Sequence, residues 1–191
     1  LYFASSGNPV LMLCGIGGGV GAALLGYQKF AHVKKRVAIW LDPWSDYDNA
    51  GYQLIQSLMA IASGGVLGVG LGLGSPTTIP VYHTDFIFSV IGEELGLVGC
   101  LLTLALLTAI VLRCVYVARH AKTRLEGYAC IGVASVIIFQ VIINVGMCLF
   151  VMPVIGLTLP FISYGGSATV VNFTLLGIVL NVSMRRFMFK S

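Results

Sequence analysis

Long apolar runs alternate with short polar connections along this 191-residue sequence. A membrane-spanning helix needs about 20 predominantly apolar residues, because the hydrocarbon core of a bilayer is about 30 Å thick. Four runs reach or approach this length, and they cover residues 9–27, 86–112, 127–152 and 168–184. The pattern predicts an all-α polytopic membrane protein with about four transmembrane helices.

The segment between the first two runs, residues 28–85, is a large loop with a different pattern. It carries both tryptophans, four basic residues and many glycines. Over residues 50–65 apolar positions recur at helical spacing, which predicts a short amphipathic helix on the membrane face that ends at Gly64 or Gly65. The glycine-rich run 64–74 lacks the Gly-Lys-Ser/Thr of a phosphate-binding loop. We expect a flexible or tightly folded loop there, with a close backbone approach to a lipid headgroup as the alternative.

The composition supports the membrane class and excludes others. Hydrophobic residues make up 58% of the chain and charged residues only 9%, whereas soluble domains contain about 25% charged residues. The net charge of +4 is small and dispersed, so we expect no nucleic-acid partner. The five cysteines lie in or beside apolar runs without CxxC spacing, which supports neither a zinc site nor a disulfide framework.

The basic residues predict the orientation. Seven of the eleven lie on one predicted side of the membrane, in the connection 113–124 and in the tail 185–190. By the positive-inside rule these segments, and with them the C-terminus, are cytoplasmic. The loop 28–85 and the loop 153–167 are then extracytoplasmic. Because the sequence starts with Leu1 rather than Met, we expect a fragment of a longer protein.

Three carboxylates lie in the stretch VYHTDFIFSVIGEELG. A carboxylate at membrane depth is unfavourable and marks a functional site by default. Asp85 opens the second run, where an acid also favours the positive end of the helix dipole. On a continuous helix Glu93 lies about 12 Å deeper than Asp85 and is rotated by about 80° about the helix axis. Glu94 is rotated by about 180° relative to Asp85. We therefore interpret Asp85 as the acid that meets a substrate at the surface, and Glu93 and Glu94 as structural polar groups that tie helices together or line a polar cavity.

Other polar residues leave two interpretations open. Asn144 is expected to hydrogen-bond across helices, as amides in spanning segments usually do. Lys35 and Arg36 either extend their charges to the interface or attract an anionic phosphate headgroup.

Four motifs in order resemble those of the SEDS (shape, elongation, division and sporulation) family. They read RVAIWLDPWSDYDNAGYQLIQSLMAIASGGVLGVGLG, HTDFIFSVIGEELGLVG, INVGM and LPFISYGGSA, and the resemblance covers about residues 36–180. It implies a bacterial cytoplasmic-membrane glycosyltransferase of ten transmembrane helices that polymerises lipid II into peptidoglycan. It also implies a class B penicillin-binding protein as partner. Residues 1–191 would be the C-terminal part, about helices seven to ten, in the orientation predicted above.

The resemblance also implies roles for individual residues. The aspartate of the HTDFIF motif is the family's proposed catalytic residue, and here it is Asp85. Lipid II carries a pyrophosphate leaving group, so the reaction needs one base and positive charge near the departing pyrophosphate. That charge would come from Arg36 and its neighbours or from a divalent metal ion, for which the sequence assigns no ligands. The candidate substrate-binding residues are Lys35, Arg36, Gln56, His83, Ser163, Tyr164 and Ser167.

Two other functions remain open. Glu93, Glu94 and Asn144 would line a pathway in a flippase or transporter of lipid-linked precursors. A non-catalytic scaffold that positions a penicillin-binding protein would instead tolerate changes at Asp85.

Overall fold

The computed structural model describes residues 9–47, 50–74 and 83–187, and its regular elements there are all helical. They are α2 (Pro9–Lys29), α3 (Ala31–Leu41), the 3-10 turn η1 (Pro43–Asp46), α4 (Ala50–Gly64), α5 (Ile87–Arg119), α6 (Arg124–Cys148) and α7 (Gly166–Phe187). Within the described ranges, three helices are long and apolar enough to cross a membrane: Ile87–Arg119, Arg124–Cys148 and Gly166–Arg185. The predicted fold class, an all-α polytopic membrane protein, is confirmed.

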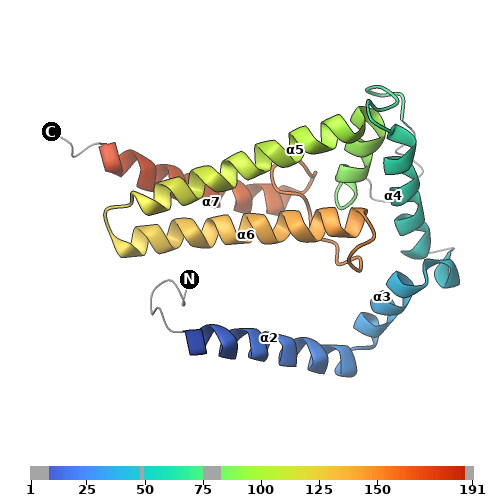
Figure 1. Ribbon diagram of the computed structural model, residues 1–191, viewed down its shortest axis with the longest axis horizontal. Coiled ribbons are helices and arrows are strands. Elements are labelled where there is room, and N and C mark those ends of the chain that lie inside the picture. Colours follow the sequence, from blue (N-terminus) through green and yellow to red (C-terminus); the bar gives the residue numbers. More distant parts are fainter. Residues whose placement is uncertain (1–8, 48–49, 75–82, 188–191) are drawn as a thin grey trace.

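The three candidate spans form a bundle (Figure 1). In this view α5, α6 and α7 run with similar axes, and α4 crosses the end of the bundle at a steep angle. The helix α2 runs below α6 and reaches the same end through α3. The helices α3 and α4, which fall in the predicted large loop, therefore lie together at one end of the bundle, which we call the α4 end.

The large loop contains more helix than the sequence pattern predicted. The amphipathic helix is present as α4, and it ends at Gly64. The polar segment before it also folds, as α3, which the sequence analysis missed. Two apolar residues explain this helix: Ile39 is buried, and the indole N–H of Trp40 donates to the carbonyl oxygen of Phe150 at 3.1 Å.

The helix predicted over residues 86–112 differs from the observed α5 in its end and in its continuity. α5 continues to Arg119, seven residues beyond the expected end, because Arg113 and Arg119 are exposed and long basic side chains can extend to the membrane surface. The helix is also broken at Gly96, whose φ of 65° and ψ of −162° are not helical. The part after the break, residues 97–119, is roughly 34 Å long at 1.5 Å per residue, enough to cross the hydrocarbon alone.

The break is closed by the glycine-rich loop that follows α4. A break in a helix leaves backbone groups without their usual partners, and an unpaired backbone group inside a membrane is very unfavourable. Here the loop supplies the partners through backbone hydrogen bonds from Val69 N–H to Glu93 O (2.9 Å), Gly70 N–H to Glu94 O (3.1 Å), Leu97 N–H to Gly65 O (3.0 Å) and Val98 N–H to Val66 O (3.2 Å). The glycine run is thus tightly folded against α5, as one of the two interpretations predicted.

Two apolar clusters hold the bundle together. One joins α4, α5, α6 and the loop after α6 around Phe86, Phe88 and Leu159. The other joins α5, α6 and α7 and includes Cys114, Cys130 and Ala134, whose small side chains allow close helix packing. The cysteines at 100, 114, 130 and 148 are free and buried, and Cys14 is free and exposed.

Candidate functional site

Asp85 lies in a turn before α5 rather than inside the helix. The helix starts at Ile87, and its N-cap position is Phe86, which makes no side-chain capping bond. The angles drawn from a continuous helix that starts at Asp85 are therefore wrong, whereas the interaction of Asp85 with the positive end of the helix dipole stays a prediction. The residue is half-buried, and its backbone carbonyl accepts hydrogen bonds from Asn144 Nδ2 at 2.9 Å and from the Cys148 thiol at 3.8 Å.

Asn144 connects the Asp85 turn to the loop after α6. Its side chain is fully buried, and Nδ2 also donates to the carbonyl oxygen of Leu157 at 2.6 Å. One amide group therefore holds two irregular segments, which are distant in sequence, at the end of α6. The predicted hydrogen bonding of Asn144 is present, but its partners are backbone carbonyls of a turn and a loop.

The loop between α6 and α7 passes beside the Asp85 carboxylate. A Cβ atom placed on Gly156, where φ is 82°, would lie 3.3 Å from Asp85 Oδ2. Further along, the Tyr164 N–H donates to the carbonyl oxygen of His83 at 2.8 Å, and the two rings meet edge to face at 5.9 Å. His83, Tyr164 and Asp85 are thus brought together, as expected if both segments lie at one membrane surface.

The two basic candidates of α3 separate. Arg36 Nη1 donates to the Val154 carbonyl oxygen at 2.7 Å, which places its guanidinium on the loop that carries Gly156. Lys35 Nζ instead lies 3.8 Å from Asp46 Oδ2 in η1. Arg36 therefore places positive charge on the loop after α6, whereas Lys35 lies beside an acid of its own segment.

The remaining predicted binding residues differ in exposure. The Ser163 hydroxyl is buried and accepts a hydrogen bond from the Leu159 N–H at 2.8 Å, so it shapes the loop. Ser167 is exposed in the first turn of α7, and Gln56 is half-buried on α4.

A buried hydroxyl pair beside this site escaped the sequence analysis. Ser57 Oγ of α4 lies 2.6 Å from Ser89 Oγ of α5 and also donates to the Cys148 carbonyl oxygen at 3.1 Å. The pair links α4, α5 and α6 directly behind the Asp85 turn. Single serines in apolar runs give little warning of such a contact, because their partners are 32 and 91 residues away.

Glu93 and Glu94 have different surroundings from Asp85. Glu93 is 9% exposed, and a Cβ on Gly74 would lie 3.1 Å from its carboxyl carbon. The Glu94 side chain is half-buried, and its Cγ is also close to Gly74. Both glutamates therefore pack under the glycine-rich loop, next to the break in α5.

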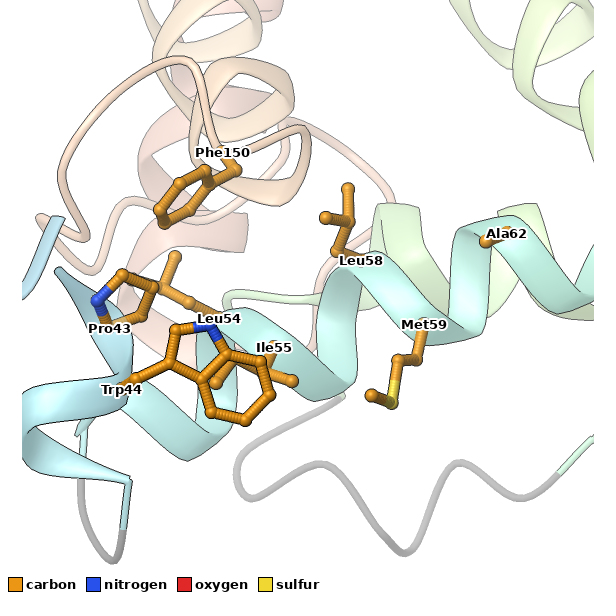
Figure 2. Close-up of a pocket in the computed structure, with 8 residues that line it drawn as sticks. All are labelled: Pro43, Trp44, Leu54, Ile55, Leu58, Met59, Ala62 and Phe150. Atoms are coloured by element: carbon orange, nitrogen blue, oxygen red, sulfur yellow. The ribbon is translucent and has the colours of Figure 1, made fainter. Parts of the chain in front are cut away.

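The α4 end also has an apolar pocket of about 310 Å³ (Figure 2). Phe150 stands opposite α4, while Pro43 and Trp44 close another side, and the lining is Pro43, Trp44, Leu54, Ile55, Leu58, Met59, Ala62 and Phe150. None of the predicted site residues is among them. In the described part of the chain, no group of three or more His, Cys, Asp or Glu side chains is arranged to hold a metal ion.

Comparisons with known proteins identify a matching family model and similar proteins. The family model of FtsW, RodA and SpoVE, described as cell cycle protein, matches residues 2–187. The chain is 42% identical over 160 residues to the peptidoglycan glycosyltransferase RodA of Mycobacterium tuberculosis, which covers 84% of this chain and 34% of the relative. It is 39% identical over 175 residues to the stage V sporulation protein E of Bacillus subtilis, covering 91% and 47%.

A solved structure shares the fold as well as the sequence. The structure is described as the structural coordination of polymerization and crosslinking by a peptidoglycan synthase complex. One chain of it matches this chain with a TM-score of 0.68 and 34% sequence identity, and the match covers 91% of this chain and 49% of the other. The molecule is thus an integral membrane protein of the cytoplasmic membrane. The chain belongs to the SEDS family, and it spans about a third to a half of the length of the curated relatives described above.

Proposed function

We propose that this chain is part of a peptidoglycan glycosyltransferase that polymerises lipid II at the outer face of the cytoplasmic membrane, in cell elongation or division. The observation that supports this most is the position of Asp85. Gly156 leaves room beside its half-buried carboxylate, and Asn144 donates to its backbone carbonyl. Relatives at about 40% identity carry the name of that activity.

The proposed glycosyl transfer needs one base and one positive charge from the protein. The hydroxyl oxygen of the acceptor sugar forms a bond to the donor's anomeric carbon, while the bond from that carbon to the pyrophosphate oxygen breaks. Asp85 takes the proton of the attacking hydroxyl as general base. Arg36 stabilises the negative charge of the departing pyrophosphate.

The proposal includes orientation and partner. The α4 end faces the outside, where lipid II is polymerised, and the C-terminus is cytoplasmic, in agreement with the distribution of basic residues. A class B penicillin-binding protein is the partner, and the similarity to a chain of a peptidoglycan synthase complex supports it.

One observation favours a second function, the transport of a lipid-linked precursor. Broken helices form the binding sites of many transporters, and α5 is broken at Gly96 beside Glu93 and Glu94. In this chain, however, backbone groups at the break are paired with the glycine-rich loop. Movement of labelled lipid II between leaflets without formation of glycan polymer would establish the transporter.

The decisive experiment is Asp85→Asn in the full-length protein, assayed for polymerisation of lipid II into glycan strands. Loss of a general base lowers the rate by about 10²–10⁴-fold, and the variant should unfold at the same temperature as the wild type. Asp85→Glu, which keeps the carboxylate, should retain some activity. Full activity of Asp85→Asn would exclude the catalytic role and leave the scaffold as the better explanation.

A further inference from the structure

The loop between α4 and α5 has a surface unlike that of an ordinary connection. Residues 65–74 alternate glycine with aliphatic residues, and we call them the glycine–aliphatic loop. The exposed fractions of its large side chains are 80% for Leu67, 41% for Val69, 76% for Leu71 and 76% for Leu73. No charged residue interrupts this stretch. A contiguous apolar surface of this kind is unfavourable in water and marks an interaction site.

Backbone polar groups of the same loop are paired within the protein. The N–H groups of Gly68, Val69, Gly70 and Leu73 donate to carbonyl oxygens of α4, α5 or the loop itself, at 2.8–3.1 Å. Positive φ angles at Gly68, Gly70 and Gly72 allow the chain to turn back on itself there. Irregular backbone is tolerated near hydrocarbon only when its polar groups are paired within the protein. These four N–H groups of the loop meet that condition.

The surface of the loop is continuous with a helix that crosses the membrane. Backbone bonds from Leu97 to Gly65 and from Val98 to Val66 place the loop against the first turn after the break. Leu97 and Val98 are 54% and 53% exposed on the most apolar candidate span. Because the loop adjoins the exposed apolar side of α5, a bilayer that covers this side of the helix also reaches the loop.

We propose that the glycine–aliphatic loop is a membrane-inserted anchor, with Leu67, Leu71 and Leu73 in the lipid at the α4 end of the bundle. Its depth follows from the break: residues 97–119 span the hydrocarbon, so the loop beside Leu97 lies at the hydrocarbon boundary rather than at the midplane. The anchor holds the loop backbone on the break in α5 and covers Glu93 and Glu94. This proposal is independent of the catalytic role of Asp85.

The test measures what surrounds the loop in the full-length protein reconstituted in lipid bilayers. Cys14, the exposed cysteine of the described residues, is replaced by Ser, and a bimane fluorophore is attached to Leu71→Cys or Leu73→Cys. Two controls calibrate the signal. Leu106→Cys lies on an exposed apolar position of α5, and Arg124→Cys lies at the exposed start of α6 on the polar connection. Quenching is measured with lipids brominated on their acyl chains and, separately, with iodide in water.

Brominated lipid should quench the label at positions 71 and 73 about as strongly as at position 106, and several-fold more strongly than at position 124. Iodide should quench the label mainly at position 124. Iodide quenching at 71 equal to that at 124 would overturn the proposal, because the loop would then lie in water. Protection from both quenchers would also overturn it, because a protein surface, from the rest of the chain or from a partner, would then cover the loop.

Discussion

Asn144 donates a hydrogen bond of 2.9 Å from its side-chain amide to the backbone carbonyl of Asp85, 59 residues earlier in the chain. The same nitrogen donates to Leu157 at 2.6 Å. One buried amide therefore joins the candidate catalytic turn to the loop after α6, in addition to the backbone bond from Tyr164 to His83.

Replacing this amide should loosen the site and the fold together. Asn144→Leu removes both donors and leaves two carbonyl groups without this partner, at about 1–3 kcal/mol for each that stays buried and unpaired. Thermal unfolding of the purified protein should show a clear loss of stability, and lipid II polymerisation should fall. Gln140→Leu, one turn earlier on α6 and half-buried, is the control and should change both far less. Equal effects of the two substitutions would mean that the Asn144 bonds contribute nothing specific.

Gly156 allows the loop to approach the carboxylate. Gly156→Ala adds a Cβ 3.3 Å from Asp85 Oδ2 and places Ala at a φ of 82°, which costs roughly 1–2 kcal/mol. We expect a loss of polymerisation activity beyond the loss of stability, because the carboxylate must move. Gly72→Ala serves as the comparison, since its φ is 72° with nothing within 4 Å of the added Cβ. Activity assays at matched folded fraction separate the two effects.

Arg36 should contribute through its charge and its planar geometry. Arg36→Ala should lower kcat/KM for lipid II, and Arg36→Lys should restore only part of it, because an ammonium keeps the charge but not the directed guanidinium contacts. Lys34→Ala, also exposed on α3, should have little effect. If Lys34→Ala and Arg36→Ala reduce activity equally, the general positive charge of α3 is responsible rather than the position of Arg36.

Close backbone contact at the break in α5 can be tested with a pair of glycines. A Cβ on Gly68 would overlap the backbone of Glu94, whereas a Cβ on Gly65 meets nothing within 4 Å. Both residues have positive φ, at 82° and 54°, so both alanine variants carry the left-handed penalty of roughly 1–2 kcal/mol. Only Gly68→Ala should also separate the loop from α5, seen as a larger drop in unfolding temperature and faster hydrogen exchange of the Val69 and Gly70 amides.

Several elements were predictable because their cause is local. The apolar runs, the amphipathic α4 and its end at Gly64 follow from helical periodicity and from the glycine that stops it. The HTDFIF stretch singled out Asp85, since a carboxylate beside a spanning segment is rare. The end of α5 was missed because a hydrophobicity count stops at Arg113, although a helix continues past it when the charged side chain is exposed.

Other features had no signal in the local sequence. Gly96 lies in an apolar run that carries no local sign of a break, and backbone groups of residues 65–70 pair with the helix there. Lys35 and Arg36 are neighbours with the same charge. They differ in role because one meets Asp46 and the other Val154.

The sequence by itself determined the membrane class and the approximate positions of the apolar helices, since composition and periodicity act along the chain, and it led to the prediction that Asp85 is the reacting acid. Tertiary structure alone decided that Asn144 holds the Asp85 turn and that the glycine run completes a broken helix. These contacts join a side-chain amide or a backbone N–H to backbone carbonyl oxygens 13 to 59 residues away. Such partners are selected by the shape of the folded chain, because every residue offers the same N–H and C=O groups and the sequence alone does not show which of them will meet.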